Sequence, residues 1–460
     1  MKYIKPEIGF YKNALALMLP MIIQNIVTNT MQLADTFMVG ALGEIELAAV
    51  TMANSIFFVL LLLIFGIQSG ASVLVAQYNG RGSVDAVNRV MGIGLYASLG
   101  LTTIVSLLTF FFPREIMGII TNNADLIEPG ADYARIVGFS YVFMAISGIY
   151  ISVQRSMENP RFGAYLLTIS GIMNIVLNYM LIFGKWGAPA MGCAGAALAT
   201  VISRVFEVLV VLIYAPLSKR LPLELPLVFR PGRLIAGDFV RYSLPVICNE
   251  GLWSLAMTVY AVIMGHMPDS TPILAAYTIS GNIDRLVAVA LFAAGNASAV
   301  ITGREIGRGN RDTLYSIGVA LNRLCFSTGI ASLVGLLLVR QFAADSFIFP
   351  LMNISAEAGG IAKYMLLLLA LVMPLRAVNL CNIVGVFRGG GDVHYALMCD
   401  VSPIYFICLP TAALCGLVFG LGIKAVYLCM CADELIRICL TLPRLKSGKW
   451  INNVTRDTLV

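Results

Sequence analysis

The chain has 460 residues, of which 59% are hydrophobic and only 12% are charged. A water-soluble protein carries about twice that charged fraction, so the composition excludes a soluble globular protein. The formal net charge of +6 comes from basic residues spread over short segments between apolar runs, which argues against a nucleic-acid-binding surface. We therefore expect an all-α polytopic membrane protein that is surrounded by membrane lipid and binds no nucleic acid.

Apolar runs recur along the whole chain, and each is long enough to cross a hydrocarbon core of about 30 Å as a helix. They predict twelve transmembrane helices, near residues 14–40, 48–77, 90–112, 134–153, 163–184, 192–215, 240–265, 272–302, 316–339, 361–386, 395–416 and 420–442. Lysine and arginine concentrate in alternate loops and near both ends of the chain, which places both termini in the cytoplasm. The expected location is the plasma membrane, with the first run retained as a span and not cleaved as a signal peptide.

An internal repeat divides the chain into two halves. The sequence GRGSVDAV at residues 80–87 follows the second span, and GRGNRDTL at residues 307–314 follows the eighth. Because each half contains an even number of spans, both halves insert in the same orientation, as in a recurring transporter architecture. We expect two pseudo-symmetric six-helix lobes, residues 1–215 and residues 241–460 with the cytoplasmic tail, joined by a cytoplasmic linker at residues 216–240.

The first span carries polar side chains along one face. Gln24, Thr28, Gln32 and Asp35 recur at intervals of four, four and three residues, which aligns them on a helix. An ionised carboxylate near the centre of an inserted helix costs on the order of 2.5 to 3.5 kcal/mol, so its presence indicates a functional role. We expect Gln24, Thr28 and Gln32 to line a cavity and Asp35 to be the residue on which the protein's activity depends.

Two further spans carry comparable polar stripes. Ser170, Asn174 and Asn178 lie four residues apart on the fifth span, and Glu250 and Ser254 begin a similar stripe on the seventh. Glu250 has no basic neighbour on its own helix and therefore also indicates function. Ser254 is expected to line a cavity, although such hydroxyl groups can also serve only as hydrogen bonds between helices.

Other charged residues inside spans have partners within reach. Arg204 and Glu207 are three residues apart on the sixth span and can pair on one helix face. Arg376 on the tenth span has no partner on its own helix and can pair with Asp284 across the lobe. The residues of the second lobe that we expect to line its cavity, besides Ser254, are Asp284, Arg376, Asn379 and Asn382.

The sequence offers no motif for an enzyme or for a bound cofactor. The glycine cluster at residues 389–391 follows a membrane span and lacks the Gly-Lys-Ser/Thr ending of a phosphate-binding loop. A nucleophile with a neighbouring base is not apparent, and the cysteines lie mostly inside apolar runs without metal-ligand spacing. We therefore expect a protein that is not an enzyme and that has no cofactor and no structural metal.

Several segments together resemble the multidrug and toxic compound extrusion (MATE) family over essentially the whole chain. The matching segments are ADTFMVGALG at 34–43, NIVLNYMLIFG at 174–184, GCAGAALAT at 192–200, NEGLWSLAMTVY at 249–260 and FRGGGD at 387–392. The resemblance implies two six-helix lobes that form a V-shaped cavity. It also implies export of amphipathic, often cationic compounds in exchange for protons or sodium ions.

The resemblance further implies roles for individual residues. In such relatives an aspartate of the first helix and polar residues of the fifth form a cation site, which assigns coupling to H⁺ or Na⁺ to Asp35, Asn174 and Asn178. An acid on the seventh helix of NorM-like relatives assigns a second cation or substrate contact to Glu250. The tenth span, 361–386, departs from that pattern because it contains no acid, which argues against a sodium site in the second lobe.

The sequence therefore predicts a monomeric secondary antiporter that exports small amphipathic or cationic molecules by alternating access. A lipid-linked oligosaccharide flippase of the same superfamily is the alternative, and it would need a cavity rich in basic residues. The basic residues that lie well inside spans are Arg204, Arg285, Arg376 and Arg437, which is few for that purpose. A receptor or channel would leave the six-plus-six repeat without an explanation.

Overall fold

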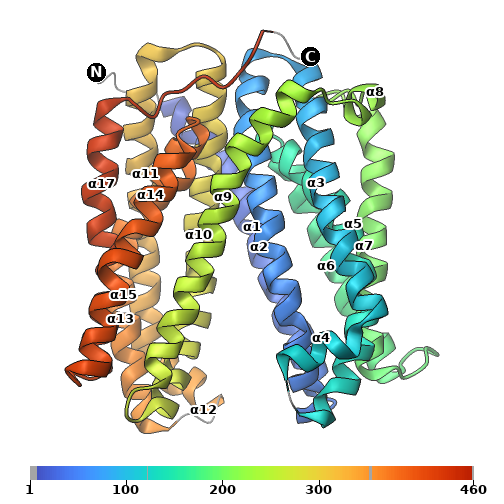
Figure 1. Cartoon of the computed structure of the whole chain (residues 1–460), viewed down its shortest axis with the longest axis vertical. Helices are drawn as coiled ribbons and strands as arrows, with labels where there is room; N and C mark the ends of the chain where they lie inside the picture. Colours follow the sequence, from blue (N-terminus) through green and yellow to red (C-terminus); the bar gives the residue numbers. More distant parts are fainter. Residues whose placement is uncertain (1–7, 122, 352–354, 458–460) are drawn as a thin grey trace. The chain divides into compact units, whose positions relative to one another are not determined.

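The structure, a computed structural model, describes residues 8–121, 123–351 and 355–457. Within these ranges the chain forms helices joined by short turns, and no β-strand occurs (Figure 1). Eleven of the described helical segments are long and apolar enough to cross a membrane. The expectation of an all-α polytopic membrane protein is confirmed.

The helices follow one another along the whole chain. The long helices of the first half are α1 (Ile8–Gly40), α2 (Glu44–Arg81), α3 (Val84–Phe111), α5 (Ala124–Ser156), α6 (Pro160–Phe183) and α7 (Gly192–Leu217). The helices of the second half are α9 (Arg233–Gly265), α10 (Ser270–Gly307), α11 (Arg311–Leu338), α13 (Ala356–Leu380), α14 (Val393–Pro403), α15 (Leu409–Ala413), α16 (Ile423–Cys431) and α17 (Asp433–Ser447). Three short helices, α4 (Pro113–Ile120), α8 (Leu225–Phe229) and α12 (Phe349–Leu351), lie between them. Segments of π-helix continue α11, α13, α14 and α15 at Val339–Ile348, Cys381–Phe387, Ile404–Cys408 and Leu414–Val418.

Glycine determines where two of the long helices end. Gly82, which follows α2, has a φ of 80°, and Gly184, which follows α6, has a φ of 65°. Glycine adopts this left-handed conformation without steric cost, and its amide then bonds to a carbonyl of the last helical turn. Gly82, the second glycine of the GRGS segment, therefore ends α2 and allows the chain to turn into α3.

The twelfth predicted span differs from the other eleven. The run at residues 420–442 is divided between α16 and α17, which are separated at Ala432. Asp433, Glu434 and Arg437 follow directly after this break. With 9 residues in α16 and 15 in α17, neither helix alone is long enough to cross a membrane, so the described chain has eleven long apolar helices where the sequence predicts twelve.

The chain separates into two compact units. The unit that we call C-terminal contains the described residues up to Ile22 and residues Cys248–Thr455. The unit that we call N-terminal contains residues Ile23–Ile247 and the chain from Arg456 onward. Helices α1 and α9 therefore each supply residues to both units.

The segment predicted as a linker, residues 216–240, packs within the N-terminal unit. Asn88 of α3 donates a hydrogen bond to the Pro222 carbonyl at 3.0 Å and accepts one from the Glu224 amide at 3.3 Å. Together with α8, these contacts hold the segment against α3. The division into lobes at 1–215 and 241–460 stays a prediction from the sequence repeat.

Glycine also permits close packing inside the N-terminal unit. A Cβ atom on Gly195 of α7 would lie 2.6 Å from the carbonyl oxygen of Leu181 on α6. That separation is shorter than a normal carbon–oxygen contact, so only glycine lets α6 and α7 approach this closely. Around this contact, apolar side chains such as Leu60 and Tyr141 form a buried core.

The core of the C-terminal unit takes side chains from both ends of the chain. Ala14 and Met18 of α1 belong to the same buried cluster as Leu445 and Trp450. The indole Nε1 of Trp450 donates a hydrogen bond to the carbonyl oxygen of Leu445 at 3.1 Å. The tail that follows α17 is therefore part of the folded unit at least as far as Trp450.

Candidate functional site

The Asp35 carboxylate of α1 meets two asparagines of α6 in the N-terminal unit. Nδ2 of Asn178 donates a hydrogen bond to Oδ1 of Asp35 at 2.5 Å, and the same nitrogen lies 3.3 Å from Oδ1 of Asn174. Both asparagines are buried, whereas Asp35 is partly exposed. The structure thus brings together the three residues to which the sequence analysis assigns ion coupling.

These three side chains supply oxygen atoms to one small region. Oδ1 of Asn178 is buried and has no hydrogen-bond partner among the described residues. Carboxylate and amide oxygens are the ligands that hard cations prefer, and a carboxylate can alternatively take a proton. The donor set is chemically suited to Na⁺ as well as to H⁺.

Glu207, a second acid of the N-terminal unit, has partners that Asp35 lacks. Nη1 of Arg204 lies 2.9 Å from both carboxylate oxygens of Glu207, and Ser147 and Ser170 donate hydrogen bonds to the same group at 2.9 and 2.7 Å. The predicted pair of Arg204 and Glu207 is confirmed. Among the described residues, no basic side-chain nitrogen lies within 4.0 Å of the Asp35 carboxylate, and Arg204 acts on it only at longer range.

Three acids of the C-terminal unit, Asp284, Asp400 and Asp433, are paired with arginines. Nη1 of Arg376 lies 2.8 Å from both carboxylate oxygens of Asp284, which confirms the pair expected between α10 and α13. Nη2 of Arg437 on α17 lies 3.1 Å from carboxylate oxygens of Asp400 and Asp433. Each arginine offsets negative charge that would otherwise be left unpaired in a poorly solvated position.

Glu250 has a basic partner that the sequence analysis missed. Nη2 of Arg388 donates a hydrogen bond to Oε1 of Glu250 at 2.9 Å, and the two side chains are 3% and 16% exposed, respectively. The neighbouring Asn249 donates to Oδ2 of Asp400 at 2.7 Å. Arg388 belongs to the FRGGGD segment just beyond the predicted end of the tenth span, so no helical spacing connects it with Glu250.

Two asparagines that were expected to line the cavity are buried between helices. Asn379 of α13 donates from Nδ2 to the backbone oxygen and to Oε2 of Glu434 on α17, both at 2.8 Å. Asn382 accepts a hydrogen bond from Nδ2 of Asn322 on α11 at 2.7 Å. In this structure the two side chains therefore join neighbouring helices of the C-terminal unit, as the hydroxyl groups of other spans can also do.

The remaining residues predicted as cavity lining are more accessible. Gln32 is exposed, and Gln24, Thr28 and Ser254 are partly buried. The hydroxyl of Thr28 donates to the backbone oxygen of Gln24 at 2.9 Å, and that of Thr258 donates to the backbone oxygen of Ser254 at 3.1 Å. Their role as lining residues stays a prediction.

Long apolar helices in two compact units define a polytopic membrane protein. The chain belongs to the MatE family, whose family model matches residues 20–180 and 245–414. This is a family of transporters and not of enzymes, so both the resemblance seen in the sequence and the expectation that the protein is not an enzyme are confirmed.

Curated relatives are similar over nearly their full length. The probable multidrug resistance protein NorM of Thermotoga maritima is 25% identical over 453 residues, which cover 97% of this chain and 94% of the relative. The multidrug resistance protein PmpM of Pseudomonas aeruginosa is 24% identical over 416 residues, which cover 88% of this chain and 84% of the relative. The uncharacterized transporter YisQ of Bacillus subtilis is 23% identical, with 91% of this chain and 90% of the relative covered.

Solved structures share the fold. An outward-facing multidrug resistance MATE family transporter of the MOP superfamily has a TM-score of 0.85, with 95% of this chain and 96% of that chain covered. A MOP superfamily transporter from Pyrococcus furiosus has the same TM-score. Both are 20% identical to this chain, so the likeness concerns the fold alone.

Proposed function

We propose that the protein is a secondary antiporter that exports amphipathic, often cationic, drugs in exchange for protons or sodium ions. Relatives that are named multidrug resistance proteins support drugs as the substrate class. One observation carries the ion coupling. Asp35 is hydrogen-bonded to Asn178 but has no basic partner among the described residues, whereas Glu207, Asp284 and Glu250 are each paired with an arginine.

Asp35 couples drug export to ion uptake because the drug and the ion compete for its carboxylate. In its ionised form the carboxylate attracts a cationic drug, and when it takes a proton or Na⁺ its charge is neutralised and the drug leaves. Charge is costly inside a membrane, so neutralisation by the ion stabilises the site. A single charge that moves through 100 mV gains about 2.3 kcal/mol, which is sufficient for a drug gradient of tens-fold.

Coupling also requires two conformations that differ in their affinity for the drug and for the ion. In the proposal, lobes 1–215 and 241–460 rock, so that the site is open to one side of the membrane at a time. The protein acts as a monomer in the plasma membrane. Both termini lie in the cytoplasm, which is supported by the distribution of lysine and arginine between loops.

Glu250 provides a second contact for the substrate or for a cation in this proposal. Because Arg388 already donates to its carboxylate, an incoming cationic group has to displace the guanidinium. Nη1 of Arg388 is buried and has no hydrogen-bond partner among the described residues, so the arginine is incompletely satisfied in this position. The incomplete hydrogen bonding of Arg388 favours an ion pair in which Glu250 can exchange the guanidinium for a cationic ligand.

The pairing of the arginines argues against the flippase alternative. A lipid-linked oligosaccharide carries a pyrophosphate and would need basic side chains that are free to bind it. Of the four arginines inside predicted spans, Arg204, Arg376 and Arg437 each pair with a carboxylate of the chain, which leaves the exposed Arg285 as the remaining one. This pairing supports the antiporter.

A resistance assay tests the role of Asp35. Asp35→Asn, expressed at the wild-type level in a drug-sensitive host, is expected to confer no resistance, because an amide neither attracts a cationic drug nor exchanges a proton. Asp132→Asn is the matched control, since Asp132 is an exposed aspartate of α5. Wild-type resistance from Asp35→Asn would contradict the proposal.

Drug counterflow in liposomes identifies the coupling ion. Purified protein is reconstituted, and an inward gradient of protons or of Na⁺ is imposed in separate arms. Drug movement by the wild type is expected to accelerate with one of these gradients, and Asp35→Asn is expected to respond to neither. A wild-type flux that is indifferent to both gradients would refute ion coupling.

A further inference from the structure

We propose that the ion pair of Arg204 and Glu207 on α7 sets how tightly Asp35 holds the coupling ion. Arg204 weakens the binding of a cation at Asp35, and Glu207 holds the guanidinium in place and offsets its charge. This role presupposes the proposed coupling function of Asp35. The side chains of Arg204 and Glu207 are 24% and 2% exposed, so the pair interacts mainly with the protein and not with solvent.

One face of α6 connects the ion pair with Asp35. Asn178 donates a hydrogen bond to Asp35 and to Asn174, and one turn earlier the hydroxyl of Ser170 donates to Oε1 of Glu207 at 2.7 Å. All three side chains of α6 are buried. Ser170 and Asn178 are eight residues apart, which corresponds to about 12 Å along the helix. The ion pair is therefore held in the same unit as Asp35, at a distance of the order of two helical turns.

Three helices fix the position of the guanidinium through Glu207. The carboxylate accepts hydrogen bonds from Ser147 of α5 and Ser170 of α6, and it receives Nη1 of Arg204 from α7 at 2.9 Å on both of its oxygens. An arginine that is bound to both oxygens of a fixed carboxylate has little freedom to move. Glu207 thus acts on Asp35 through Arg204, which makes it a positioning residue.

The charge of Arg204 acts on Asp35 at longer range than a direct ion pair. Tyr133 of α5 also interacts electrostatically with Asp35, but its phenol is neutral at physiological pH. Among the described residues, Arg204 is therefore the charged side chain that acts on this carboxylate. Two unit charges about 12 Å apart in a protein of effective dielectric constant about 20 change a binding constant about tenfold.

A weak positive charge near Asp35 serves the transport cycle. An antiporter has to release the bound ion in every cycle, and the neutral oxygens of Asn174 and Asn178 do nothing to repel a cation. Charge is costly inside a membrane, so an ion that neutralises Asp35 is held firmly. A guanidinium about 12 Å away weakens this binding without occupying the site itself.

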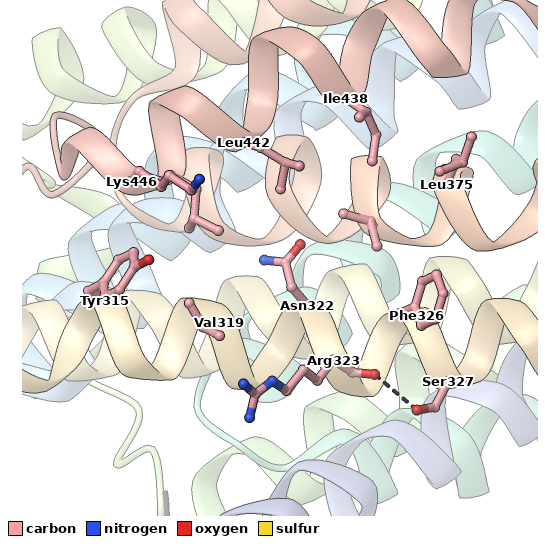
Figure 2. Close-up of a pocket in the computed structure, with 12 residues that line it drawn as sticks. Tyr315, Val319, Asn322, Arg323, Phe326, Ser327, Leu375, Ile438, Leu442 and Lys446 are labelled. Atoms are coloured by element: carbon pink, nitrogen blue, oxygen red, sulfur yellow. Dashed lines mark hydrogen bonds between the residues drawn. The ribbon is translucent and has the colours of Figure 1, made fainter. Parts of the chain in front are cut away.

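The groove shown in Figure 2 offers no comparable site for a cation. It lies between α11 and α17 of the C-terminal unit and has a volume of about 560 Å³. Its lining includes Arg323 and Lys446, and none of the twelve residues that line it is an acid. We therefore do not expect this groove to contribute to the ion dependence of transport.

Drug counterflow in liposomes with the full chain tests the role of the ion pair. Drug movement is measured against the concentration of protons and, in a separate arm, of Na⁺, with the drug below its own half-saturating concentration so that it does not mask the affinity for the ion. Arg204→Gln is expected to lower the half-saturating concentration of the coupling ion about tenfold, and Glu207→Gln is expected to raise it about tenfold. The double variant Arg204→Gln/Glu207→Gln should lie within about threefold of the wild type, because neither charge remains.

Two further variants separate electrostatics from a structural effect. Arg204→Lys keeps the positive charge and is expected to stay within about threefold of the wild-type half-saturating concentration. Its comparison with Arg204→Gln decides the case even where Glu207→Gln does not fold. Arg114→Gln is the matched control, since Arg114 belongs to an exposed ion pair with Glu128 in the same unit, and it should cause no shift.

The outcomes distinguish this role from the proposed function. Shifts of the two single variants in the same direction, or no shift in Arg204→Gln while the wild type responds to the ion and Asp35→Asn does not, would overturn the role of the pair and leave the function of Asp35 intact. A wild type that responds to neither ion would refute the proposed function, and the role of the pair would fail with it.

Discussion

Asp35 and Glu250 are both acids on long helices, but their immediate neighbours give them different properties. Asp35 accepts a hydrogen bond from the neutral amide of Asn178, whereas Glu250 accepts one from the guanidinium of Arg388. A cation can approach Asp35 without displacing a positive group of the protein. At Glu250 it must first separate an ion pair, so the two acids are suited to different steps of transport.

The pair of Arg388 and Glu250 gives a prediction about stability. Arg388→Gln is expected to lower the free energy of unfolding by on the order of 3 kcal/mol, because the charge of Glu250 is left without its partner. The double variant Glu250→Gln/Arg388→Gln should be more stable than Arg388→Gln alone, since neither charge remains. Thermal or denaturant-induced unfolding of the purified proteins measures both effects. A double variant that is less stable than the single one would refute this account.

Ligand-induced stabilisation tests the exchange of partners at Glu250. If a cationic drug replaces Arg388 in this ion pair, the drug should raise the unfolding temperature of Arg388→Gln by more than that of the wild type. The reason is that binding to the variant no longer requires the guanidinium to leave. Equal shifts in the two proteins would show that the drug does not contact Glu250.

Among the helices, contacts that follow from spacing on one helix, or from a charge without a local partner, could be predicted. Arg204 and Glu207 lie one turn apart on α7, and periodicity alone indicated their pair. Arg376 has no acid within one or two turns on its own helix, and this directed attention to Asp284. The sequence therefore contained enough information for these two ion pairs, but not for the pairs of Arg437 with Asp400 and Asp433, which also lie inside predicted spans.

Contacts that depend on irregular segments could not be predicted. Arg388 is 138 residues from Glu250 and follows the predicted end of its span, so neither hydropathy nor helical spacing connects them. The interruption at Ala432 was missed as well, because apolar residues resume beyond the charged side chains that follow it. Similarly, the packing of residues 216–240 against α3 depends on hydrogen bonds of Asn88 that no periodic pattern indicates.

Close packing of α6 and α7 gives a prediction with an internal control. Gly195→Ala is expected to destabilise the protein by about 1–3 kcal/mol, because the added Cβ would overlap the backbone of Leu181. Gly100 of α3 has no heavy atom within 4 Å of the position of an added Cβ, so Gly100→Ala should stabilise by about 0.5–1 kcal/mol. Thermal unfolding in the same detergent compares them. Changes of equal sign would contradict the packing argument.

On the scale of the whole molecule, the tail after α17 is tied to residues that precede it by hundreds of positions. Trp450 is 0% exposed in the core of the C-terminal unit. Further along, Arg456 donates to the two carboxylate oxygens of Asp238 at 2.5 and 2.7 Å within the N-terminal unit. These hydrogen bonds and the negative charge of Asp238 raise the pKa of Arg456. The Arg456 guanidinium therefore stays protonated throughout the physiological pH range.

The burial of Trp450 gives a prediction for the tail. Trp450→Ala is expected to lower the free energy of unfolding by about 3–5 kcal/mol, because it leaves a cavity and removes the hydrogen bond to Leu445. Lys449→Ala, at an exposed neighbouring position, should change it by less than about 0.5 kcal/mol. Unfolding curves of the two variants provide the comparison. Similar small effects would mean that the tail does not stabilise the unit.

The shared core of α1 and the tail has a consequence for biosynthesis. A chain that is made from its N-terminus delivers Ala14 and Met18 to the membrane long before Trp450, which belongs to the same cluster, leaves the ribosome. The C-terminal unit therefore completes its core only after Trp450 has been synthesised. The N-terminal unit has nearly all of its residues once Ile247 has been inserted. During translation, the first turns of α1 are therefore inserted before Leu445 and Trp450, with which they share a core, have been synthesised.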